Sequence, residues 1–202
     1  MKEGFRGTVT KIHTLACKTK CYLIQALEGY LLFDAGWPGK HSLFKDAAKA
    51  AGVRMKDIMA FVVSHFHADH AGLAGMFVAN GIRFVVFENQ VNQIDEMEGL
   101  MRRKGYPYTA IDKSRIDIMR LPDSRAWLKS MQIDGEIIQT FSHGNDGILL
   151  LLDSGEAFIG DLPLMQEYSE LARSDWALLR SRHARYIFPA HARNFELTIG
   201  SI

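Results

Sequence analysis

The sequence of 202 residues contains only two cysteines, Cys17 and Cys21. Two cysteines cannot build the disulfide framework of a small secreted protein. They could form one bond, but two reduced thiols fit better with a chain that shows no export signal. Lys and Arg together number 24 and Asp and Glu 23, which gives a formal net charge of +1. A charge this close to zero gives no sign of a nucleic-acid partner.

Long apolar runs are also missing. The longest, Ile148–Leu152, has the length of a buried strand, whereas a membrane-spanning helix needs about 20 apolar residues. Met1–Thr14 lacks the apolar core of a signal peptide. We therefore expect a cytoplasmic protein with no membrane association. Because no low-complexity segment or change of composition marks a linker, we predict one domain over residues 1–202.

A dense group of metal-binding side chains lies between residues 64 and 70, which read Ser-His-Phe-His-Ala-Asp-His. The apolar run Ile58–Val63 before it predicts a buried strand, and small apolar residues after it predict a helix over about 72–80. The group is therefore expected on a loop at the carboxyl end of a strand, where open α/β architectures build their sites. Three histidines and an aspartate in a polar loop have no good explanation as core packing.

The spacing of these side chains indicates which of them can bind the same metal ion. Side chains alternate in an extended segment, so His65 and His67 point to the same side and can bind one ion as a pair. Asp69 and His70 follow after the chain turns, and they can reach a second ion nearby. Imidazole together with carboxylate suits zinc, iron or manganese.

Four further candidates follow the ends of other predicted strands. Asp34 could orient a metal-binding histidine by accepting its second N–H, or it could simply form a turn with the Ala and Gly that follow it. His143, Asp161 and His191 each stand one to three residues past an apolar strand. A lone histidine at a strand end is usually structural, but this repeated placement favours one metal site at one edge of the sheets.

The remaining pattern mixes strands and helices and predicts an α/β protein. Strands are expected at 8–13, 21–27, 30–34, 58–63, 83–87, 136–141, 148–152, 156–161 and 185–188, and helices at 41–51, 72–80, 89–104 and 167–182. Residues 105–130 show weak periodicity, so we expect a loop with short elements there, of the kind that forms a lid or a substrate loop. The aromatic candidates for the walls of a substrate pocket are Trp37, Tyr106 and Tyr108.

Taken in order, these motifs resemble those of the metallo-β-lactamase superfamily, the zinc-hydrolase fold that glyoxalase II and lactonases share. The resemblance covers nearly the full chain. It is carried by Leu32-Phe33-Asp34-Ala35-Gly36, His65-x-His67-x-Asp69-His70, His143, Ile159-Gly160-Asp161-Leu162 and Pro189-Ala190-His191. It implies a four-layer αββα sandwich with two mixed sheets flanked by helices. One departure follows His143, where the family usually reads Thr-Pro-Gly and this chain reads Gly-Asn-Asp-Gly.

The resemblance also implies a role for each ligand. His65, His67 and His143 would hold one metal ion, and Asp69, His70 and His191 would hold a second. Asp161 would bridge the two ions, and Asp34 would orient a ligand. The pair of divalent ions, zinc ahead of iron or manganese, would supply a hydroxide for hydrolysis, with Asp69 and Asp161 as the catalytic carboxylates. His67 stands where the diiron flavoprotein branch has Glu, which favours hydrolysis over the reduction of dioxygen or nitric oxide.

The expected substrate is a small-molecule ester, thioester or lactone. The sequence runs only 11 residues past His191, so we expect no glutathione-binding helical domain of the classical glyoxalase II type. A length of 202 residues leaves no room for the inserted domain of nucleic-acid-processing members, so we expect none. Two other classes of function stay open. A single iron at the same ligands could oxygenate a persulfide, and the site could serve a non-catalytic metal sensor. The sequence is compatible with a homodimer.

Overall fold

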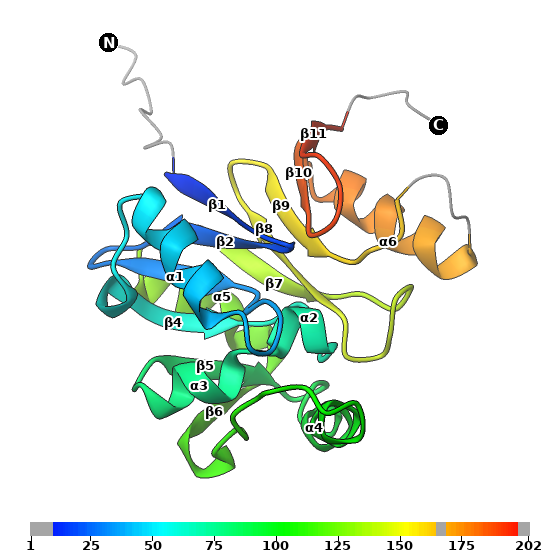
Figure 1. Cartoon of the computed structure of the whole chain (residues 1–202). Coiled ribbons are helices and arrows are strands. Elements are labelled where there is room, and N and C mark those ends of the chain that lie inside the picture. Colours follow the sequence, from blue (N-terminus) through cyan, green and yellow to red (C-terminus); the bar gives the residue numbers. More distant parts are fainter. Residues whose placement is uncertain (1–9, 165–168, 198–202) are drawn as a thin grey trace.

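The computed structural model describes residues 10–164 and 169–197. Two β-sheets pack face to face, and helices cover their outer faces (Figure 1). The first sheet holds β1 (Ile12–Cys17), β2 (Thr19–Gln25), β3 (Tyr30–Phe33), β4 (Ile58–Val62), β5 (Arg83–Phe87) and β6 (Ile116–Met119), in that order. The second holds β7 (Gly135–Gln139), β8 (Ile148–Leu152), β9 (Glu156–Gly160), β10 (Tyr186–Pro189) and β11 (Phe195–Glu196), in the order β11-β10-β9-β8-β7.

Both sheets are mixed. In the first, β1, β2 and β3 pair antiparallel, and β3 to β6 pair parallel. In the second, β9 and β10 are parallel, and the other pairs are antiparallel. Parallel neighbours end at the same edge of a sheet, so the loops after β3 and β4 lie close together, as do those after β9 and β10. The predicted α/β class, with two mixed sheets flanked by helices, is confirmed.

The helices connect the strands. They are α1 (His41–Ala50), α2 (Ala68–Ala71), α3 (Ala74–Ala79), α4 (Gln93–Arg103), α5 (Ser124–Ser130) and α6 (Glu170–Ser181), with short 3-10 turns at Met55–Asp57, Lys113–Arg115 and Leu121–Asp123. Helix α6 begins after Ser169, whose hydroxyl accepts a hydrogen bond from the amide of Ala172 at 3.0 Å. None of the described helices is long and apolar enough to cross a membrane.

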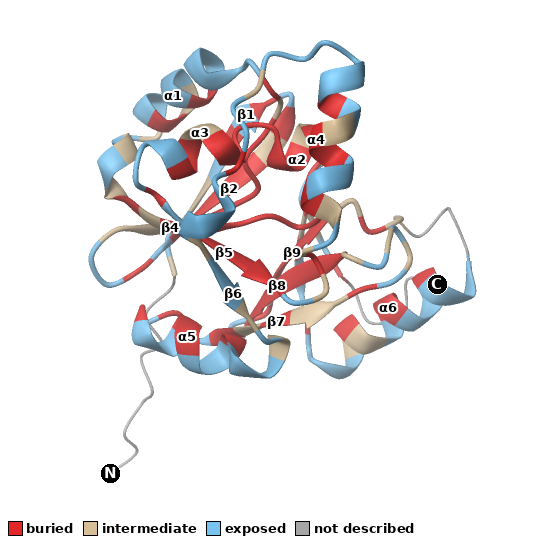
Figure 2. Cartoon of the chain, turned by 90° about the horizontal axis from the view of Figure 1, so that it is seen from below, coloured by how far each residue is buried: buried red, intermediate tan, exposed pale blue. Residues whose placement is uncertain are grey.

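The two sheets and the helices on their outer sides make four layers, and three apolar clusters fill the spaces between them. Along β4, Phe61 packs toward the helices while Ala60 and Val62 pack toward the second sheet. Along β8, Leu150 faces the first sheet and Leu149 faces α6. Central strands are thus buried on both faces, whereas the helices keep an exposed outer side (Figure 2). This is why the central strands read as unbroken apolar runs in the sequence.

One strand differs in its bounds from the predictions, and the segment 105–130 can be compared with them. Residues 8 and 9 of the first predicted strand lie outside the described residues, but the strand found here runs on to Cys17 and turns back at Lys18 into β2. The segment 105–130 consists of short elements joined by loops, as predicted: it contributes β6 to the first sheet and α5 against β7. The lid or substrate loop expected there stays a prediction. Tyr168, in the predicted helix 167–182, also lies outside the described residues, and the single-domain assignment stays a prediction.

Candidate metal centre

Five loops bring the predicted ligands together. They follow β3, β4, β7, β9 and β10, and they carry Asp34, the 64–70 group, His143, Asp161 and His191, respectively. The ligand candidates form two groups, and within each group one nitrogen or oxygen atom per residue lies within 4.8 Å of the others. The chain thus has two neighbouring positions suited to a metal ion, as the spacing in the sequence predicts.

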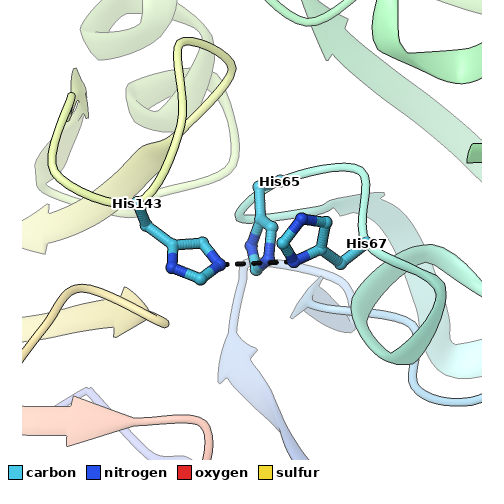
Figure 3. A group of neighbouring side chains, drawn as sticks. All are labelled: His65, His67 and His143. Atoms are coloured by element: carbon cyan, nitrogen blue, oxygen red, sulfur yellow. Dashed lines mark hydrogen bonds between the residues drawn. The ribbon is translucent and has the colours of Figure 1, made fainter. Parts of the chain in front are cut away.

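The first position is made of three imidazoles. His65 and His67 come from the loop after β4, and His143 comes from the loop after β7, on the other sheet (Figure 3). Nε2 of His143 lies 3.2 Å from Nδ1 of His67. His65 is buried, whereas the other two rings are exposed. Three imidazoles with an open side match the usual form of a catalytic zinc position.

The second position combines two carboxylates with two imidazoles. Nε2 of His191 lies 3.0 Å from Oδ2 of Asp69 and 3.3 Å from Oδ1 of Asp161. The buried Nε2 of His70 lies 3.2 Å from the same Oδ1 of Asp161. The other oxygen of Asp161 lies 3.8 Å from Nε2 of His143, in the first position. Asp161 therefore stands between the two positions, with one oxygen toward each.

The donor atoms themselves indicate that a cation belongs here. Nε2 of His65, Nε2 of His70 and Oδ1 of Asp161 are buried and make no hydrogen bond within the described chain, although the last two lie close together. A buried polar atom without a partner costs free energy, and here such atoms occur at both positions, which calls for a bound partner such as a cation at each. The residues present therefore fit two metal ions.

Asp34 and Ser64 hold the buried ligands in place. Asp34 is fully buried, and its Oδ2 lies 2.9 Å from Nδ1 of His70. Its Oδ1 accepts a hydrogen bond from the amide of Ser64 at 2.7 Å. The hydroxyl of Ser64 lies 3.0 Å from Nδ1 of His65. Because Nδ1 of each ring is engaged, Nε2 of each faces the metal position. Asp34 thus lies where the sequence predicts it, while nothing in the sequence marked Ser64.

The surroundings set the charge of the buried ligands in different ways. Burial lowers the pKa of His65 well below its usual value, and the neighbouring His70 lowers it further. For His70, burial also acts to lower the pKa, but Asp34 and Asp161 outweigh it and raise the pKa to about 10. The first position therefore offers a neutral imidazole. At the second, an arriving cation would displace a proton from His70.

A cavity of about 670 Å³ opens beside the two positions. Its polar floor is formed by His143, Asp161 and His191, and its walls are formed by Gly160, Leu162, Pro163, Leu164, Pro189, Ala192 and Phe195. This volume lies in the range of small-molecule sites. The exposed edges of the candidate ligands therefore lie next to a mainly apolar surface.

The three aromatic residues predicted as pocket walls are not among the residues that line this cavity, and their contact with a substrate stays a prediction. Trp37 and Tyr106 pack edge to face with ring centroids 6.3 Å apart, and Tyr108 lines a separate hollow beside α3. The reason is the path of residues 105–112, which cross against α3: a Cβ on Gly75 would lie 1.9 Å from the carbonyl oxygen of Thr109. The walls instead follow β9 and β10, whose apolar residues gave no signal beyond core packing.

The unusual segment after His143 is joined to the loop of His65 and His67. Oδ2 of Asp146 accepts a hydrogen bond from the amide of Phe66 at 2.7 Å. The side chain of Gln90 donates to the carbonyl oxygens of both Val63 and Asp146, at 3.0 and 3.1 Å. The two loops that carry the first position are thus held to each other by side chains of this chain's own Gly-Asn-Asp-Gly segment and of Gln90.

Replacing Asp146 with alanine should weaken metal binding at the first position about 10- to 100-fold, because partners that orient ligands have effects of this size. Asp146→Asn keeps an oxygen toward the Phe66 amide and should recover most of the affinity. Asp153→Ala, at an exposed carboxylate paired with Arg125, is the matched control. Zinc affinities measured by competition with a chelator test this, and equal affinities in all four proteins would contradict it.

Comparison with known proteins agrees with this geometry. A model of the metallo-β-lactamase superfamily matches residues 15–82, which include Asp34 and the whole 64–70 group. A metallo-β-lactamase family protein from Thermus thermophilus is 15% identical, with a TM-score of 0.67 over 92% of this chain and 74% of that chain. TTHA1623 in a di-iron-bound form is 16% identical, with a TM-score of 0.65 over 90% and 91%. The metallo-β-lactamase FIM-1 from Pseudomonas aeruginosa, in a mono-zinc form, is 16% identical, with a TM-score of 0.62 over 88% and 78%.

The chain therefore has the metallo-β-lactamase fold, an αββα sandwich with a cluster of histidines and aspartates at one edge. The family model matches the part of the chain that carries Asp34 and the 64–70 group, and the structural neighbours share the fold that the motifs in the sequence predict. Proteins of this fold occur with iron and with zinc, so the fold leaves the metal open.

Proposed function

We propose that this protein is a metal-dependent hydrolase that acts on a small-molecule ester, thioester or lactone through two divalent ions, most simply zinc. The observation that carries the proposal is the placement of Asp161 between two ligand groups that open on one cavity. A purely structural zinc site is closed and four-coordinate, whereas here several donors are exposed at the cavity floor.

The metal ions would supply Lewis-acid chemistry, since such ions lower the pKa of water and polarise a carbonyl oxygen. His65, His67 and His143 would hold one ion, and Asp69, His70 and His191 the other, with Asp161 fixing their separation. Asp69 offers a carboxylate oxygen at the edge of the second position that can take up a proton during attack on the carbonyl carbon. No serine or cysteine nucleophile is needed.

The cavity supports a substrate with an apolar acyl portion. Leu162, Leu164 and Phe195 form much of its wall beside the metal positions. An acyl chain on this wall leaves water, and each buried methylene contributes about 0.8 kcal/mol. We therefore expect kcat/KM to rise roughly fourfold per methylene from acetyl to hexanoyl esters. In Phe195→Ala this rise should flatten, while Leu171→Ala, at an exposed position of α6, should keep it.

The proposal is tested by metal analysis of the purified protein together with ester, thioester and lactone hydrolysis on the same samples. About two zinc or manganese ions per chain with hydrolysis of one substrate class is the expected result. About one iron per chain, oxygen consumption with a persulfide and no hydrolysis would replace the proposal by a dioxygenase. Bound metal without turnover of any substrate would favour a sensor.

A further inference from the structure

The tip of the β1–β2 hairpin reaches the second metal position from the edge of the first sheet. The chain turns at Lys18, which has a φ of +66°, and the two residues after it face the loops that carry ligands. Thr19 is fully buried although it stands beside the turn. A buried polar side chain at a hairpin tip requires a partner, and here the partner is a ligand.

Thr19 holds Asp69. Its hydroxyl donates a hydrogen bond of 3.2 Å to Oδ2 of Asp69, the same oxygen that lies 3.0 Å from Nε2 of His191. A carboxylate oxygen has two lone-pair directions, so it can accept this bond while it faces a cation. The bond fixes which way the carboxylate turns within the second position.

Lys20 holds the loop of His191 on both sides of that residue. Its amide donates to the carbonyl oxygen of Ala190 at 3.1 Å. Its ammonium donates to the carbonyl oxygen of Pro189 at 3.3 Å, to that of Ala192, and to the side-chain oxygen of Asn194 at 3.1 Å. The hydroxyl of Tyr22 adds a bond of 2.8 Å to the Pro189 carbonyl oxygen. The residues on both sides of His191 thus bind the ammonium group of Lys20.

We propose that Thr19 and Lys20 are positioning residues for the second metal position, so that the hairpin tip sets the occupancy of that position independently of the first. Thr19 orients Asp69, and Lys20 orients the backbone that carries His191. Among the described residues, the side-chain hydrogen bonds of Thr19 and Lys20 go to Asp69 and to the residues around His191, and not to His65, His67 or His143. The inference rests on the proposed binding of two ions.

The test compares Thr19→Val, Thr19→Ser and Lys20→Met with the wild type. The metal-free proteins are titrated with Co²⁺, and binding is followed by calorimetry and by the visible absorption of the bound ion. In Thr19→Val and Lys20→Met, affinity for the second ion should fall about 10- to 100-fold while the first keeps its affinity and spectrum. Thr19→Ser keeps the hydroxyl and should restore the second affinity. Thr109→Val and Lys11→Met, at exposed positions, are the matched controls.

Melting temperatures of the metal-free proteins separate positioning from folding. They should stay close to the wild-type value in Thr19→Val, whose shape matches threonine. If both affinities fall in parallel with the melting temperature, the residues act on the fold and the inference is wrong. If wild type and Thr19→Val bind two ions equally well, the inference fails while the proposed function stands. If the wild type binds no second ion, both fail.

Discussion

Replacing Asp161 with alanine is expected to reduce bound metal from about two ions per chain to one or fewer, and to lower kcat/KM at least about a hundredfold. A partner that only orients a ligand already costs about 10- to 100-fold, and Asp161 offers one oxygen to each position. Its loss also leaves His70, His143 and His191 without the carboxylate between them. Metal content by mass spectrometry and steady-state kinetics on the same sample measure both effects.

Asp161→Asn separates charge from shape, because the amide keeps one oxygen but carries no negative charge. We expect it to retain more metal than alanine and yet remain impaired, since a neutral oxygen binds a divalent cation less strongly. Asp117→Ala removes a half-exposed carboxylate of β6, which pairs with Arg83 on the surface, and should leave metal and activity unchanged. Full metal content and activity in Asp161→Ala would exclude a bridging role.

The sequence was sufficient to predict the candidate ligands because each stands just beyond an apolar strand, which is a local signal. His65 and His67 are two residues apart in the sequence, and Asp161 follows the apolar β9 directly. Parallel pairing then brings the carboxyl ends of neighbouring strands to one edge. A pattern that is local in the sequence was thus enough to predict which residues come together in the candidate site.

The contacts that hold those ligands could not be predicted in this way. Thr19 lies 50 positions from Asp69, and Asp146 lies 80 positions from Phe66. The first contact depends on the order of strands in the first sheet, and the second depends on how the two sheets pack. Ser64 and Gly160 look like ordinary turn residues in the sequence. The walls of the cavity could not be predicted for the same reason, since an aromatic residue in a loop carries no information about the side of the sheet on which that loop lies.

Gly160→Ala is expected to lower the free energy of unfolding by about 2 to 5 kcal/mol and to weaken the first metal position as well. Gly160 has a φ of +54°, a left-handed conformation that costs other residues roughly 1 to 2 kcal/mol. An added Cβ would also lie 2.5 Å from both Cβ and Oγ of Ser64, and overpacking of this kind costs about 1 to 3 kcal/mol. Denaturant unfolding of the metal-free protein measures the loss.

Gly52→Ala is the matched control for the backbone term. Gly52 also has a positive φ, +76°, but a Cβ there would meet no atom within 4 Å. It should therefore cost only about 1 to 2 kcal/mol and leave metal binding unchanged. The difference between the two variants measures the clash with Ser64. Similar losses in both, with wild-type metal affinity, would show that the site tolerates the added methyl group.

The clash has a further consequence because Ser64 also contacts Asp34 and His65. Moving its hydroxyl to make room for a methyl group would free Nδ1 of His65, so stability and metal affinity should fall together in Gly160→Ala. Adding Ser64→Gly removes the clash, but it does not restore a hydroxyl group beside Nδ1 of His65. The double variant should therefore regain about 1 to 3 kcal/mol of stability relative to the sum of the single variants, while its metal affinity stays low. Stability and affinity that recover together would mean that Ser64 positions no ligand.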